Sequence, residues 1–362
     1  MMFVSKLLGN YRLHFIYMTT FETFLNKFNE KQWLGVLMSI SPEIHEVDRS
    51  ATQIWFRFYP LELFRHLQKA EDKAKAIQQF VMQGDYELNT QIDSSHRFLY
   101  GHRFWKETKD AIVKHAETFQ SDSGDLANEI RTVAKAAATA AKTSADLTLG
   151  ITAVGLMTLV QVGFDAFKQS SGATSVDAKT KNQSPNKIVE ERAKDDSQGI
   201  LGFLKTNNQQ WSVNYIDDTD SGKFKLMNDE EIASGAARDQ SKNWVERDFR
   251  RGEGVIPVEC RAAACGTCWV GVIGGAEKLS DVEPRERKQM KIFGYNQGDE
   301  AKPLMRLACQ AKAEGAVSIV IPPWNGVFGK KVYANVEDVE LEPATTSAAK
   351  LRETISTAMK DD

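Results

Sequence analysis

Three of the four cysteines in this 362-residue chain fall within nine residues, and the fourth follows after forty more. The spacing is Cys260-x4-Cys265-x2-Cys268, followed by Cys309. So few cysteines cannot form the disulfide framework that holds small secreted domains together. Thiolates clustered in one loop are typical of metal sites. The number of residues between the cysteines limits which metal centre the loop can surround. The spacing therefore predicts a metal centre in the C-terminal third.

Two metal chemistries use four thiolates, and the spacing favours one of them. A structural zinc site normally takes two C-x2-C turns, but only Cys265 and Cys268 make such a pair. A [2Fe–2S] cluster needs a longer loop and one thiolate from elsewhere, and its plant-type spacing is C-x4-C-x2-C…C. The sequence thus predicts a [2Fe–2S] cluster held by Cys260, Cys265, Cys268 and Cys309, with a zinc-stabilised module as the alternative.

Small residues fill the positions between these cysteines. Ala262, Ala263, Ala264, Gly266 and Thr267 leave room for backbone N–H groups to point at the sulfur atoms. Glycine also permits a close backbone approach or a positive φ angle. We therefore expect this loop to surround the cluster with hydrogen-bond donors.

Residues 209–325 resemble the plant-type [2Fe–2S] ferredoxin family. The stretches that carry the resemblance are "VIPVECRAAACGTCWVGVIGGAEKLS" and "RLACQAKAEGAVSIVIP". The resemblance implies a β-grasp domain in which Cys260 and Cys265 hold the iron nearer the surface, and Cys268 and Cys309 the inner iron. It also implies that the cluster is contacted by Arg261, Ala262, Gly266 and Thr267.

The chain departs from that family in two respects. Ala263 stands where many members have glycine, so we expect a slightly different backbone angle in this loop. Residues 207–342 contain 22 acidic and 18 basic residues, so the strongly acidic docking face of many ferredoxins is not evident. The basic residues near the loop predict either a local patch or an ordinary solvated face; they are Arg250, Arg251, Arg261, Arg285, Arg287, Lys288 and Lys291.

The N-terminal region, residues 1–168, has helical patterning throughout. Thr19 and Glu22 form a capping-box signature at the start of the first amphipathic run. Residues 147–164 are 18 consecutive uncharged residues, close to the length of a membrane span. Both a buried helix and a membrane-inserted helix fit this stretch, and the sequence leaves the two open.

The remaining segments complete a multidomain organisation, an all-α N-terminal region followed by an α+β domain. Residues 169–206 are predicted to be a flexible linker, since residues 169–200 contain no aromatic residue. The ferredoxin-type domain is predicted over 207–342, and a polar tail over 343–362.

These features together predict a one-electron carrier with a single cluster. A net charge of −3 gives no reason to expect nucleic acid as a partner. No dinucleotide-binding or P-loop glycine motif is present, so we expect a carrier or a subunit of a larger oxidoreductase and not a complete enzyme. Its electron donor and acceptor would be other redox proteins.

The alternative is a redox sensor whose helical region binds a partner according to cluster state. The N-terminus lacks a clean signal-peptide run, which predicts a cytoplasmic protein, with membrane association through 147–164 as a variant.

Overall fold

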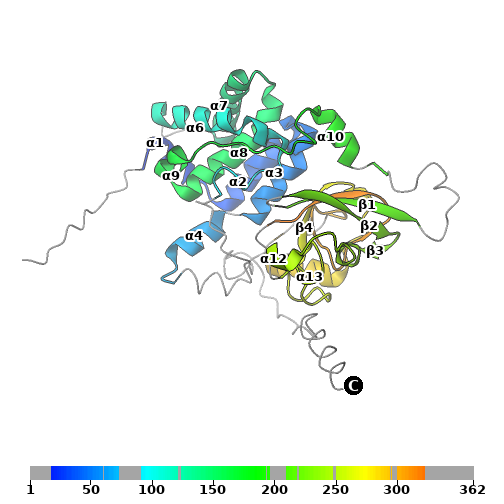
Figure 1. Cartoon of the computed structure of the whole chain (residues 1–362). Helices are drawn as coiled ribbons and strands as arrows, with labels where there is room; N and C mark the ends of the chain where they lie inside the picture. Colours follow the sequence, from blue (N-terminus) through cyan, green and yellow to red (C-terminus); the bar gives the residue numbers. More distant parts are fainter. Residues whose placement is uncertain are drawn as a thin grey trace, which may run out of the picture.

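The computed structural model combines a helical region with a mixed β-sheet, and the two pack against each other (Figure 1). The described residues are 18–59, 61–72, 91–120, 124–192, 194–195, 209–217, 220–247, 250–293, 295 and 300–322. The predicted polar tail, 343–362, lies outside them, as do residues 1–17.

The described part of the N-terminal region is entirely helical, as predicted. Its elements are α1 (Thr20–Leu25), α2 (Glu30–Ile40), the 3-10 turn η1 (Ser41–Glu43), α3 (Glu46–Phe58), α4 (Leu61–Lys69), the 3-10 turn η3 (Tyr100–Phe104), α6 (Trp105–Thr118), α7 (Leu126–Ala141), α8 (Ala145–Val162) and α9 (Phe164–Gln169). The capping box is present, because the Thr19 hydroxyl accepts from the Glu22 N–H and the Glu22 carboxylate accepts from the Thr19 N–H. Local capping chemistry therefore sets the start of the first helix.

Helix α8 is the central helix of this region (Figure 1). Its length and composition would allow it to cross a membrane, but the buried core helix of a soluble protein can have the same length and composition. In this structure 78% of the helix is buried inside the protein. A Cβ added at Gly155 would lie 2.6 Å from the Ile112 side chain, so glycine allows α6 to approach closely. The side-chain N–H of the buried Gln161 donates to the Tyr59 carbonyl at 3.1 Å. Of the two structures that the sequence allows, this fold has the buried helix.

A short helix, α10 (Pro185–Arg192), occupies the segment predicted to be a flexible linker. Its Ile188 side chain is buried, and the Arg192 carbonyl accepts from the Ser318 hydroxyl at 2.6 Å. The Arg192 guanidinium donates to the Val47 carbonyl in α3. Residues 185–192 of the predicted flexible linker therefore form a helix that contacts both α3 and β7. Composition did not reveal these contacts because they depend on groups that lie far away in the sequence.

The C-terminal part is built on a five-stranded mixed sheet in the order β2-β1-β7-β4-β5. The strands are β1 (Gln210–Ile216), β2 (Ser221–Met227), β4 (Trp269–Gly274), β5 (Met305–Leu307) and β7 (Val317–Val320). Strands β1 and β7 are parallel, and the other pairs are antiparallel. A second, two-stranded sheet pairs β3 (Glu230–Glu231) with β6 (Lys312–Ala313). The helices of this part are α11 (Ile232–Ala237), α12 (Trp244–Arg247) and α13 (Pro284–Phe293).

The two parts meet where α3 lies on β4. A Cβ added at Gly271 would lie 2.6 Å from Ile54, so the glycine lets the helix sit directly on the strand. The rings of Phe58 and Tyr295 also meet edge to face, with centroids 5.9 Å apart. Apolar contacts of this kind hold the helical region on the sheet.

A fully buried ion pair joins α13 to β5, directly ahead of Cys309. The Arg306 guanidinium donates two hydrogen bonds of 2.9 Å to the Glu286 carboxylate, and both side chains are 0% exposed. Glu286 also accepts from the Leu307 N–H at 2.7 Å, and Arg306 donates to the Ser280 carbonyl. Every charge is therefore paired and hydrogen-bonded, which is the condition under which a buried pair is tolerated.

We expect Glu286→Gln to lower the free energy of unfolding by about 3–5 kcal/mol, because Arg306 is then left buried without a counter-ion. The measurement is urea unfolding followed by circular dichroism. Glu283→Gln, at an exposed position just before α13, is the control and should change stability by less than about 0.5 kcal/mol. Equal effects of the two substitutions would contradict this account.

Candidate metal centre

The strands bring the distant fourth cysteine next to the third. Cys268 directly precedes β4 and Cys309 follows β5, and these two strands pair antiparallel with Trp269 opposite Leu307. The Ala308 N–H donates to the Cys268 carbonyl at 2.9 Å, which continues the pairing past the end of the strands. The side chains of Cys268 and Cys309 consequently lie in contact, although forty residues separate them.

The first two cysteines form a second pair within the loop. The Cys260 sulfur accepts N–H donors from Ala262 (3.4 Å), Ala264 (3.3 Å) and Cys265 (3.3 Å). The backbone can aim these donors inward because Arg261 and Ala263 adopt positive φ angles of 52° and 56°. Successive N–H groups around an αL residue form a concavity that suits an anion or an iron–sulfur cluster.

The pKa shifts of the thiols reflect this pairing. The Cys265 thiol and the three N–H donors lower the pKa of Cys260 to about 5. The same contact with Cys260, together with burial, raises the pKa of Cys265. Its contact with Cys309, together with burial, raises the pKa of Cys268 well above its usual value, and Cys268 in turn lowers the pKa of Cys309. Within each pair, one thiol is therefore easier to deprotonate than the other.

The two thiol pairs correspond to the ligand pattern of a two-iron centre. Each iron of a [2Fe–2S] cluster takes two thiolates, and the pairs Cys260/Cys265 and Cys268/Cys309 supply two each. Among the residues that the structure describes, no group of three or more His, Cys, Asp or Glu side chains is arranged as a metal site.

The loop is more open on the side of the first pair. Cys265 is half-buried, whereas Cys260, Cys268 and Cys309 are each less than 10% exposed. The neighbouring Ala262 and Ala264 are also partly exposed. A docked protein could therefore approach Cys265 more closely than the inner pair.

Gly266 and Thr267 contribute to the loop in different ways. Gly266 has a φ of +68°, and a Cβ there would lie 2.0 Å from the Phe293 ring, so no other residue fits. The Thr267 hydroxyl lies 3.1 Å from the Cys265 sulfur, within hydrogen-bond reach. Gly266 thus packs against Phe293 and Thr267 lies beside Cys265, and the contact of either residue with the cluster stays a prediction.

The contact of Arg261 with the cluster stays a prediction, and its side chain is engaged by neighbouring residues. The guanidinium donates to the Glu253 carboxylate at 2.9 Å and to the Ser234 hydroxyl at 3.0 Å. Arg251, another member of the predicted basic patch, is buried in an ion pair of 2.8 Å with Asp217. These two arginines therefore do not form an unpaired basic face at the loop.

Two neighbours of the loop carry roles that the motif does not specify. The Gln310 amide donates to the Cys309 sulfur at 3.4 Å and to the Arg261 carbonyl at 3.4 Å, so it links the two halves of the site. Its position next to Cys309 was the only sequence signal. Phe293 lies far from the cysteines in the sequence, and no pattern indicated that its ring fills the space beside Gly266.

Comparison with known proteins gives one family and one structure. Residues 241–314 match the family described as the 2Fe-2S iron-sulfur cluster binding domain, and the N-terminal region matches no family. No curated protein matches the chain. A solved chain described as ferredoxin reductase in carbazole 1,9a-dioxygenase is 16% identical, with a TM-score of 0.21. That alignment covers 36% of this chain and spans only 30% of the other. The C-terminal part of this protein thus contains a 2Fe-2S iron-sulfur cluster binding domain, a family whose cofactor is a [2Fe–2S] cluster.

Proposed function

We propose that this protein is a one-electron carrier with a single [2Fe–2S] cluster held by Cys260, Cys265, Cys268 and Cys309. The observation that carries the proposal is the arrangement of these thiols as two contacting pairs, one of them surrounded by backbone N–H donors. The order of strands in the main sheet, with α11 packed beside β2, supports the β-grasp assignment of the domain.

The chain supplies the environment in which a single electron can be exchanged. When bound, the cluster provides a metal centre that cycles between two oxidation states. N–H groups of residues 262, 264 and 265 direct positive dipole ends at the Cys260 sulfur, which stabilises negative charge there. The buried inner pair keeps water away, while the half-buried Cys265 leaves a short route to the surface. No bond is made or broken in such a role, so a general acid or base is not needed.

The proposed partner is an oxidoreductase that docks over the open side of the loop. Arg261 at this edge is paired with Glu253, so its charge is compensated within the protein. Docking would then depend on shape and short-range contacts more than on the attraction of a single-sign surface, and it should be only weakly sensitive to salt.

Anaerobic purification of the full chain tests the cluster directly. We expect two irons and two sulfides per chain and a visible spectrum that bleaches with dithionite. Cys268→Ala should remove most of the iron, because the inner iron then loses one of its two thiolates. One zinc per chain without colour would overturn the proposal in favour of a structural zinc module.

A second test concerns the shape of the loop. Gly266→Ala should lower the free energy of unfolding of the domain by about 3 kcal/mol and reduce its iron content, since the new methyl group meets Phe293 at a positive φ. The matched control is Gly35→Ala in α2, where a Cβ meets nothing within 4 Å. That control should keep the full iron content. Full iron content in both variants would show that the loop does not need its tight packing against Phe293.

A second candidate function is a redox sensor, and one observation favours it. Aromatic rings run from the loop to the helical region, from Trp269 next to Cys268, through Tyr295 at 4.9 Å, to Phe58 at 5.9 Å between ring centroids. A change at the cluster could therefore reach α3 through packed side chains. Hydrogen exchange of α3 in the oxidised and reduced protein separates the two functions, because a carrier should show the same exchange in both states.

A further inference from the structure

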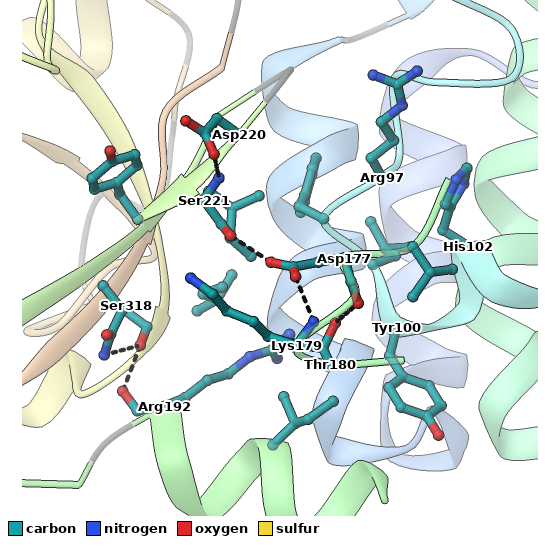
Figure 2. A pocket seen from close by; sticks show the side chains of 18 of the residues that line it. Arg97, Tyr100, His102, Asp177, Lys179, Thr180, Arg192, Asp220, Ser221 and Ser318 are labelled. Atoms are coloured by element: carbon teal, nitrogen blue, oxygen red, sulfur yellow. Dashed lines mark hydrogen bonds between the residues drawn. The ribbon is translucent and has the colours of Figure 1, made fainter. Parts of the chain in front are cut away.

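A cleft of about 810 Å³ lies at the junction of the helical region and the sheet (Figure 2). Its walls come from residues 97–103, from residues 175–192 and from the β1–β2 hairpin, residues 214–223. The volume is in the range of sites for small organic ligands. The cysteine loop does not line the cleft, so the two sites are separate.

Part of the cleft wall is apolar. Leu99, Ile188 and Ile273 line it and are themselves buried, and Val176 and Ile216 extend the apolar surface. These side chains come from both parts of the protein. An apolar surface of this kind suits the carbon skeleton of a ligand. Binding would remove apolar area of both the wall and the ligand from water, which favours the complex.

Four cations line the same cleft and form no ion pair with a carboxylate among the described residues; they are Arg103, Lys179, Arg192 and Lys223. The Arg192 guanidinium donates to the Val47 carbonyl, so the other three are the candidates for binding a ligand. Arg103 is fixed in place. Its guanidinium stacks 3.5 Å over the Tyr100 ring and donates to the carbonyls of Tyr100 (3.1 Å) and Lys181 (3.3 Å). Partial burial lowers the pKa of Arg103, as expected for a charge held away from water. A positioned cation of this kind is able to bind an anion.

The carboxylates of the cleft do not cancel these charges, and two of them are neutralised from outside it. Asp217 is paired with Arg251 at 2.8 Å, and Asp220 with Lys242; neither cation lines the cleft.

The other two carboxylates are also engaged. Asp177 accepts from the Ser221 hydroxyl at 2.5 Å and from the N–H of Lys179 at 2.8 Å (Figure 2). Glu191 accepts from the Gln183 amide at 2.8 Å and lies 3.8 Å from Lys187, a lysine outside the cleft lining. The hydrogen bonds to Asp177 come from neutral donors, so its charge remains and attracts Lys179. The cations that line the cleft still outnumber the carboxylates that are not paired with a cation from outside it.

We propose that this cleft binds a small organic anion, whose apolar body lies on the buried aliphatic wall and whose anionic group is held by Arg103, Lys179 and Lys223. The assignment stands independently of the cluster. It gives the helical region a role of its own, because residues 97–103 provide the fixed cation Arg103 and the apolar side chain of Leu99.

The test uses two fluorescent probes with similar skeletons on the full chain with its cofactor bound. 8-Anilinonaphthalene-1-sulfonate carries a negative charge, and N-phenyl-1-naphthylamine is the same type of molecule without it. We expect Lys179→Gln/Lys223→Gln to weaken binding of the sulfonate about tenfold or more, and binding of the neutral probe less than about twofold. Val176→Trp, which fills the cleft, should weaken binding of both probes.

Lys135→Gln on α7 removes the same charge from an exposed position outside the cleft and is the control. The visible absorption of the cluster, recorded for each variant, shows that the fold is intact and keeps this test separate from that of the electron-transfer role. Sulfonate binding that is unchanged in the double lysine variant, reduced equally by Lys135→Gln, or retained in Val176→Trp would overturn the proposal.

Discussion

The antiparallel pairing of β4 with β5 is the constraint on which the metal centre depends. It brings Cys309 against Cys268 across forty intervening residues. The hydrogen bond from the Ala308 N–H to the Cys268 carbonyl extends the strand pairing as far as these two cysteines. Loop closure over that distance costs entropy, which the strand hydrogen bonds and the buried pair Glu286–Arg306 offset. Without this pairing only three thiols would lie near one another, all within the loop.

The loop itself tolerates backbone strain in order to direct its donors. Ala263 occupies a positive φ of 56°, where many ferredoxins have glycine, and the cost for an alanine is about 1–2 kcal/mol. The three N–H groups aimed at Cys260 show what this conformation achieves. Strain retained at a site whose geometry is fixed by its surroundings is typical of functional loops. The tight contact of Phe293 with Gly266 is part of those surroundings.

The sequence predicted those parts that depend on local spacing. The C-x4-C-x2-C spacing placed three thiols in one loop because it is a short-range property, and the Thr19–Glu22 pair located the start of the first helix for the same reason. The outward position of Arg261 could not be predicted, because it depends on Glu253 and on Ser234 in α11 being nearby. Helix α10 was missed because its stability comes from groups such as Ser318 and Val47, more than a hundred residues away.

The same long-range contacts connect the two proposed sites through one rigid junction. Arg192 is fixed to α3 through the Val47 carbonyl and to β7 through Ser318, and it also lines the cleft. On the other side of the junction, Tyr295 packs between Phe58 and Trp269, next to the inner cysteine pair. A ligand bound in the cleft would therefore act on a helix, α3, that contacts α10 at its start and the cluster domain at its end. Coupling between two sites requires an element that both can bias, and α3 is the element that these contacts identify.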